Sequence, residues 1–250
     1  MKKIDKIFLS IILIYIILYS FNMGGRWDLG EQIFIGYKCI NTNIPLYSGT
    51  LLGKPMYNTS PYFPGVAFLS YPLKYLTNNL LFIENIMLIF SKVFLFLFIY
   101  LFYKFYKILN SNTKLNFIIF LQIVFFYILI SDSLFVYALE FKGDIASFAL
   151  FFLFLHLANK YNEKYFYILP FIIIISLFFK QQISILYFGL FISYVLKYFE
   201  TKSNYYIKLL ILLITSILIF IFLISLSESL VKHTIIAISS RDNRLEIIPF

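Results

Sequence analysis

The feature that most constrains this chain is a succession of long apolar runs separated by short segments that carry lysines. Of the 250 residues, 61% are hydrophobic and only 13% are charged, whereas soluble domains are about 25% charged. So few charged residues cannot cover a soluble globule, and the composition predicts a polytopic membrane protein of the all-α class. We predict a single transmembrane domain over residues 1–250 with about seven transmembrane helices. Their predicted bounds are Ile7–Phe21, Leu80–Tyr103, Leu115–Ser131, Ile145–Asn159, Tyr165–Phe179, Ile183–Phe199 and Tyr206–Leu226.

The distribution of charge predicts the orientation in the membrane. Many lysines lie in the short segments on one side of the predicted helices. The long first loop, in contrast, has only three basic residues, Arg26, Lys38 and Lys54. Basic residues in short loops favour the cytoplasmic side, so we predict a cytoplasmic N-terminus in an inner or plasma membrane. Most acidic residues fall at the opposite face, which indicates a site at the outer surface rather than a conduction path. The lysines predicted to lie inside are Lys2, Lys3, Lys6, Lys104, Lys107, Lys114, Lys160, Lys164, Lys197, Lys202 and Lys208.

The first outer loop, residues 22–64, is the longest polar interruption of the chain. Within it, apolar residues at helical spacing predict an amphipathic surface helix over Asp28–Asn41. The following residues, 44–64, are rich in proline and glycine and predict an irregular segment. The next run, Gly65–Leu76, is too short to cross a membrane and holds Pro72, so we expect it to be interfacial or re-entrant.

Three carboxylates at the predicted outer face are candidate catalytic residues. Asp28 and Glu31 are three residues apart and share one face of a helix, and Asp144 begins another helix. One of them could serve as a general base for an acceptor hydroxyl or amine. The alternative is structural, because carboxylates also cap helix N-termini and are favoured there by the helix dipole.

Three lysines at the same face are candidates for binding a phosphate. Lys54, Lys142 and Lys180 would supply positive charge to a lipid phosphate that arrives laterally from the bilayer. We also expect Lys142 to form a compact charged pair with the nearby Asp144. The alternative for each lysine is that its stem lies along apolar surface while its amine reaches toward water.

These motifs, in this order, resemble the GT-C class of polyprenyl-phosphate-sugar-dependent glycosyltransferases, in particular the protein O-mannosyltransferase and lipid A aminoarabinose transferase group. The resemblance rests on an acid early in the first outer loop, the Lys54-Pro55 pair, and the aromatic-proline stretch Tyr62-Phe63-Pro64. It continues in the helix start at Lys142-Gly143-Asp144 and the turn Phe179-Lys180-Gln181-Gln182. It covers about residues 7 to 226.

The resemblance implies transfer of a sugar from a polyprenyl-phosphate carrier to a glycan, lipid or protein acceptor. It places the base or acceptor-binding role on Asp28 or Glu31, the phosphate-contacting role on Lys54, and the second-loop acid at Asp144. Relatives commonly have adjacent acids where this chain reads Asp-Leu-Gly-Glu, so both early acids stay candidates. Relatives are also longer, so we expect this chain to correspond to the N-terminal part of a longer membrane domain.

Two other functions stay open on the sequence alone. A non-catalytic transporter or flippase-like component would be favoured by polar residues at mid-membrane depth, for which Lys92 and Gln122 are the candidates. An inactive truncated paralogue is the other alternative. The scattered basic residues do not indicate nucleic-acid binding. No metal site is assigned, because Cys39 is the sole cysteine and the two histidines are far apart. A requirement for a divalent cation is left open.

Overall fold

The structure, a computed structural model, describes part of the chain as a bundle of helices. The described residues are 50–51, 54–55, 65–109, 117, 119–121, 123–124, 143–160 and 163–226. They are helical apart from two antiparallel strands, β1 (Thr50–Leu51) and β2 (Lys54–Pro55), in which Leu51 pairs with Lys54. These short strands were not predicted. The predicted first span, the surface helix and the residues beyond 226 lie outside the described residues.

The longest helix is α4 (Leu80–Leu109), whose 30 residues extend about 45 Å. Its start is capped by Asn79, whose side-chain oxygen accepts a hydrogen bond from the Phe82 amide at 3.3 Å. The helix was predicted to end at Tyr103 but continues to Leu109. Lys104 and Lys107 lie over the rings of Tyr100 and Tyr103, at 5.5 and 5.6 Å from the ring centroids. These charged residues are good helix formers, so polarity alone did not end the helix.

Two of the predicted spans form helices that are shorter than a bilayer. They are α7 (Asp144–Ala158) and α8 (Leu169–Phe179), joined through the short 3₁₀ helix η2 (Glu163–Tyr165). Their 15 and 11 residues extend about 22 and 17 Å, against a hydrocarbon core of about 30 Å. The helix α8 begins later than predicted, with Pro170 in its first turn, where a missing amide proton costs nothing.

The last two helices are long and form a hairpin. After the 3₁₀ helix η3 (Gln181–Ile183) come α9 (Ser184–Thr201) and α10 (Asn204–Ser225). Within the described part, three helical stretches are long and apolar enough to cross a membrane: Leu81–Ile108, Gln181–Thr201 and Asn204–Ser225. The chain is therefore a membrane-associated protein whose described core is helical.

The centre of the bundle is built around Tyr187 of α9, which is fully buried. Its ring packs edge-on against Phe151 and Phe154 of α7, with centroids 5.3 and 5.7 Å away. Its hydroxyl lies 2.9 Å from that of Ser176 in α8, which itself donates to the Ile173 carbonyl. Since a serine has one proton to donate, Tyr187 is the donor of the shared bond. One side chain thus ties three helices together with its polar group satisfied.

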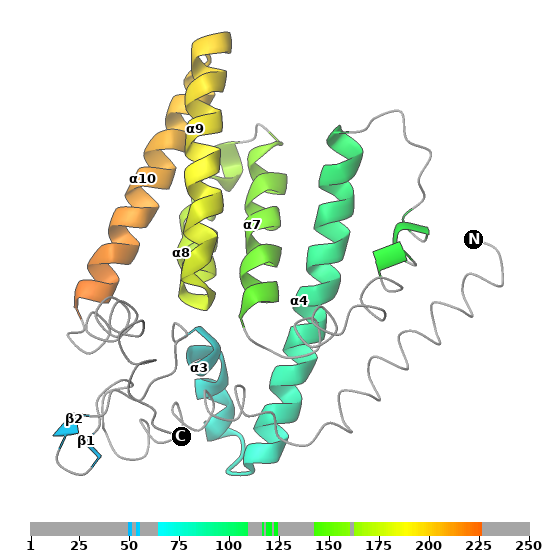
Figure 1. The fold of residues 1–250 in the computed structure, drawn as a ribbon, viewed down its shortest axis with the longest axis vertical. Helices are drawn as coiled ribbons and strands as arrows, with labels where there is room; N and C mark the ends of the chain where they lie inside the picture. The colour runs from blue at the N-terminus through cyan, green and yellow to red at the C-terminus, as the bar shows by residue number, and fades with distance from the viewer. Residues whose placement is uncertain are drawn as a thin grey trace, which may run out of the picture.

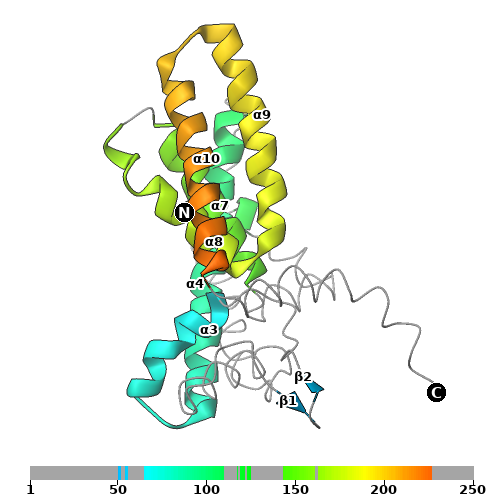
Figure 2. The ribbon, with the colours of Figure 1, turned by 90° about the vertical axis from the view of Figure 1, so that its left-hand side faces the viewer.

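Figures 1 and 2 show how the helices are directed. Both α4 and α7 begin at the same end of the bundle, which we call the Asp144 end; α8 finishes there and α9 begins there. The opposite end, where α9 turns into α10, we call the Lys202 end. Beside the Asp144 end lie the short helix α3 (Gly65–Ser70) and the 3₁₀ helix η1 (Tyr71–Tyr75). They correspond to the run predicted to be too short to span.

Two glycines allow backbone segments to approach closely at the Asp144 end. A Cβ atom on Gly65 would lie 2.7 Å from the carbonyl oxygen of Phe178, and one on Gly143 would lie 2.6 Å from that of Phe179. Gly143 also has φ of 80°, in the left-handed region that favours glycine. The starts of α3 and α7 are thereby both held against the last turn of α8.

We expect Gly143→Ala to destabilise the protein by about 2 kcal/mol or more, because the left-handed backbone costs about 1–2 kcal/mol for alanine and the methyl group overlaps a backbone oxygen. The matched control is Gly189→Ala in α9, where a Cβ atom meets nothing within 4 Å. There, alanine should be neutral or stabilising by up to about 1 kcal/mol. Thermal unfolding in detergent measures both, and equal midpoints for the two variants would contradict the close approach.

Candidate functional site

The candidate site is an ion pair at the Asp144 end, between the first residue of α7 and the turn that follows α8. The Lys180 Nζ atom lies 3.0 Å from Asp144 Oδ1 and 3.2 Å from Oδ2. The side chains of Lys180 and Asp144 are 18% and 24% exposed, so the pair is largely but not fully removed from solvent. A charged group can therefore still approach it from outside the bundle.

Local backbone geometry explains why both charges lie here. Asp144 is the first helical residue of α7, where the unpaired amides carry partial positive charge that favours a carboxylate. Ser147 donates its hydroxyl proton to the Asp144 carbonyl at 2.8 Å, in the first turn of the same helix. Lys180 is an extended residue with φ of −154° and ψ of 116°, between the end of α8 and the start of η3. The chain reverses at Lys180.

The pair lies above an apolar layer. Val66, Met87, Ala146 and Phe179 are all buried in one cluster made by α3, α4, α7 and α8. The ring of Phe179 packs edge-on against Phe94 of α4 at 5.7 Å. Such surroundings lower the local dielectric, so the two charges attract more strongly than in water and separating them is costly.

The structure brings together two of the six predicted site residues. Asp144 and Lys180, which are 36 residues apart, form the ion pair. The side chain predicted to pair with Asp144 was its neighbour Lys142, which lies outside the described residues. Asp28 and Glu31 also lie outside them. The backbone of Lys54 is in strand β2, while its side chain is not described.

Sequence reasoning did not identify the packing role of the two glycines beside this site, Gly65 and Gly143. Gly65 directly follows the predicted first outer loop, and Gly143 directly precedes Asp144. Gly65 lies against the backbone of Phe178 and Phe179, and Gly143 lies against that of Phe179, immediately before Lys180. The sequence signal for such a role is a glycine at the boundary between a loop and an apolar run. That signal does not show which backbone segment the glycine contacts.

A second charged group lies deeper in the bundle. Lys92 of α4 is only 7% exposed, and the neighbouring Ser91 is fully buried. By rise per residue, Lys92 is about 18 Å along α4 from Leu80. Gln122, the other predicted mid-membrane polar residue, lies outside the described residues. Ionisable groups inside membrane bundles commonly mark functional positions.

Within the described part of the chain, no group of three or more His, Cys, Asp or Glu residues could hold a metal ion. Comparisons with protein-family models, with curated proteins and with solved structures returned no match.

A double-mutant cycle on Asp144→Asn, Lys180→Met and the double variant should measure the ion pair. We expect each single variant to lose about 1–3 kcal/mol of stability, because it leaves a partly buried charge without its partner. The double variant should be destabilised by less than the sum of the two. Thermal unfolding reports the coupling. A double variant that loses the full sum would show that the two charges do not interact.

Proposed function

We propose that the chain is a membrane glycosyltransferase that moves a sugar from a polyprenyl-phosphate carrier to an acceptor at the outer membrane face. The observation that supports it best is the ion pair between Asp144 and Lys180 at the Asp144 end. Gly65, the first residue after the loop of Lys54, contacts the same turn of α8 that leads to Lys180. Lys180 in turn holds Asp144. The residue that follows the first outer loop, Gly65, and the residue that precedes Asp144, Gly143, thus lie against the same turn.

In the proposed reaction, Asp28 or Glu31 accepts the proton of the acceptor hydroxyl or amine. The acceptor atom bonds to the anomeric carbon as the bond to the carrier phosphate breaks on the opposite side, which inverts the configuration. The electron pair of the broken bond stays on the phosphate oxygen. Lys54, with Lys142 or Lys180, compensates the charge that develops there. The donor sugar arrives on a lipid, and the acceptor is a glycan, a lipid or a protein.

Asp144 is proposed to orient Lys180. The two carboxylate oxygens lie 3.0 and 3.2 Å from Nζ, which restricts where the ammonium group can sit. An ammonium group can donate up to three hydrogen bonds, so pairing with Asp144 is compatible with a contact to phosphate. This division of roles makes Asp144 a positioning residue and Lys180 a group that touches the carrier.

The short length of α8 supports access of a lipid-borne phosphate to Lys180 from the side of the bundle. The Phe179 ring packs on Phe94, which is about 21 Å along α4 from Leu80. The turn that holds Lys180 is thus set back from the start of the longest helix. A carrier phosphate on a long lipid could approach such a recessed charge sideways, without leaving the membrane.

The seven-span arrangement and the cytoplasmic N-terminus are also part of the proposal. Because α4 and α7 begin at the same end of the bundle, the chain must return from the Lys202 end to the Asp144 end between them. This is in keeping with the predicted span Leu115–Ser131. Lysines in the last two turns of α4, near the end of α9 and in the segment between α7 and α8 fall at the Lys202 end, in keeping with a cytoplasmic location for that end.

The second candidate is a non-catalytic transporter or flippase-like component, and Lys92 is the observation that favours it. A lysine 7% exposed within a membrane-spanning helix is the kind of group that lines a substrate or proton path. The two candidates predict different sensitive residues, so the same set of variants can distinguish them.

The enzyme proposal predicts that deleting the gene removes a sugar from the cell envelope and that the wild-type chain restores it. Lys54→Ala, and Asp28→Asn combined with Glu31→Gln, should each restore at most about a hundredth as much, because a general base contributes about 10²–10⁴-fold and charge compensation a similar factor. Lys197→Ala is the matched control, since Lys197 pairs with Glu200 on α9. Mass spectrometry of envelope glycans gives the measurement.

Unchanged envelope sugars after deletion would exclude the enzyme proposal. Loss of activity in Lys92→Met, with full activity in Lys54→Ala and in Asp28→Asn combined with Glu31→Gln, would favour the transporter instead.

The orientation can be tested in a variant that lacks Cys39 and carries one new cysteine. At position 182, which is exposed beside Lys180, an impermeant thiol reagent should label intact cells. At position 164, exposed near the Lys202 end, labelling should require permeabilised cells. The reverse pattern would invert the proposed orientation and place Lys180 on the cytoplasmic side.

A further inference from the structure

The turn between α9 and α10 holds a lysine where a glycine is usual. Lys202 has φ of 56° and ψ of 22°, and it is the only described residue other than glycine with a positive φ. This left-handed conformation after a helix is most often taken by glycine or asparagine, because other side chains strain the backbone there. A lysine at this position therefore strains the backbone, which a glycine would not do.

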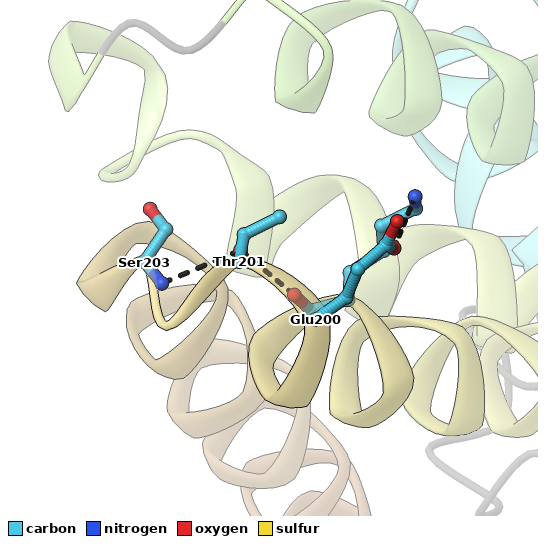
Figure 3. A network of polar contacts seen from close by, with 4 residues as sticks. Glu200, Thr201 and Ser203 are labelled. Atoms are coloured by element: carbon cyan, nitrogen blue, oxygen red, sulfur yellow. Dashed lines mark hydrogen bonds and ion pairs between the residues drawn. The ribbon is translucent and has the colours of Figure 1, made fainter.

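The turn around Lys202 is held by local hydrogen bonds (Figure 3). The Thr201 hydroxyl donates to the Lys197 carbonyl at 2.7 Å and accepts from the Ser203 amide at 3.3 Å. The Lys202 amide donates to the Tyr198 carbonyl at 2.7 Å. The backbone on both sides of Lys202 is therefore constrained, and the side chain is presented in a defined direction.

The Lys202 ammonium group lies beside exposed aromatic surface. Its Nζ atom is 5.0 Å from the centroid of the Phe199 ring and 5.7 Å from that of Tyr198. The Phe199 side chain is 63% exposed. The neighbouring carboxylate, that of Glu200, already pairs with Lys197 at 2.6 Å. A cation over an exposed apolar ring is suited to the boundary between lipid tails and headgroups.

A second lysine lies on the adjoining turn. Lys160 follows α7, and its Nζ atom lies 5.4 Å from the centroid of the Tyr165 ring. The Tyr205 hydroxyl donates to the Ala158 carbonyl at 2.5 Å, which joins the start of α10 to the end of α7. Because Tyr205 is close in sequence to Lys202 and Ala158 is close to Lys160, this bond keeps the two turns together.

Backbone charge adds to that of the lysines. The helix α10 begins here, with Ser203 as its N-cap, whose side chain accepts from the Tyr205 amide at 3.4 Å. The aligned peptide dipoles of the helix give this end a partial positive charge. Lys202 directly precedes that cap, so its charge and that of the helix end have the same sign and act on the same region.

We propose that the surface formed by Lys160, Tyr165, Phe199, Lys202 and the first turn of α10 binds an anionic phospholipid through its headgroup phosphate. The two ammonium groups supply donors for the phosphate oxygens, and the positive end of the α10 dipole favours the negative charge. Exposed apolar side chains of α9, Ile192 and Leu196, continue from Phe199 toward the middle of the helix and offer a surface for the acyl chains. A lipid matches both the charge and this adjoining apolar surface. The site is at the opposite end of the bundle from Asp144 and is independent of the function proposed above.

The test is the thermal unfolding midpoint of the purified full chain in nanodiscs made of phosphatidylcholine alone or with phosphatidylglycerol. Phosphatidylglycerol should raise the midpoint of the wild type by several degrees. Lys160→Gln combined with Lys202→Gln should lose at least half of that increase. Lys197→Gln, at the same end but paired with Glu200, should keep it.

Lys202→Gly provides a variant whose folding is not at risk, because glycine suits the backbone of the turn. Its midpoint in phosphatidylcholine should equal or exceed that of the wild type, while its response to phosphatidylglycerol should fall.

Three results would overturn the proposal. They are an equal response in the wild type and the double variant, no response in the wild type, and an equal response to soluble glycerol phosphate added to phosphatidylcholine nanodiscs. The last result would show that a free phosphate, rather than a lipid, occupies the surface.

Discussion

The close approach of three backbone segments at the end of α8 is the constraint on which the Asp144 end depends. Gly65 lies against Phe178 and Phe179, and Gly143 against Phe179, at distances that leave no space for a β-carbon. This contact sets the position of α7 along α8 and brings the first residue of α7 beside Lys180. Without it, Asp144 would be an ordinary carboxylate in the first turn of a helix and Lys180 an unconnected charge on a turn.

The lengths of the helices determine how deep in the bundle the Asp144–Lys180 pair lies. The helices α7 and α8 are shorter than the hydrocarbon thickness of a bilayer. The helix α9 is close to that thickness, and α4 and α10 exceed it. The short helix α3 lies where α8 ends, so the bundle is completed by a second segment rather than by a longer helix. A charged pair at such a junction is largely shielded by protein, with the Lys180 and Asp144 side chains 18% and 24% exposed.

The helices were largely predictable because lipid imposes a strong pattern on sequence. Apolar runs bounded by lysines located α9 and α10 to within a few residues. The errors have local physical causes. The helix α4 continues past its first lysines because Lys104 and Lys107 are good helix formers that lie over tyrosine rings. The start of α8 is set by Pro170 rather than by the first apolar residue. The small β1–β2 pair depends on hydrogen bonds between neighbouring segments, which periodicity does not report.

The amino-acid sequence alone determined the class of the protein, the location of its apolar helices and the candidate residues Asp144 and Lys180, because these follow from composition, periodicity and local motifs. Only the tertiary structure decided that Asp144 pairs with Lys180, since that contact joins residues 36 positions apart. It also decided that Lys202 adopts a left-handed backbone and that the Tyr205 hydroxyl joins its turn to α7. Such pairings depend on how helices of different lengths pack together, and no local pattern of residues specifies that packing.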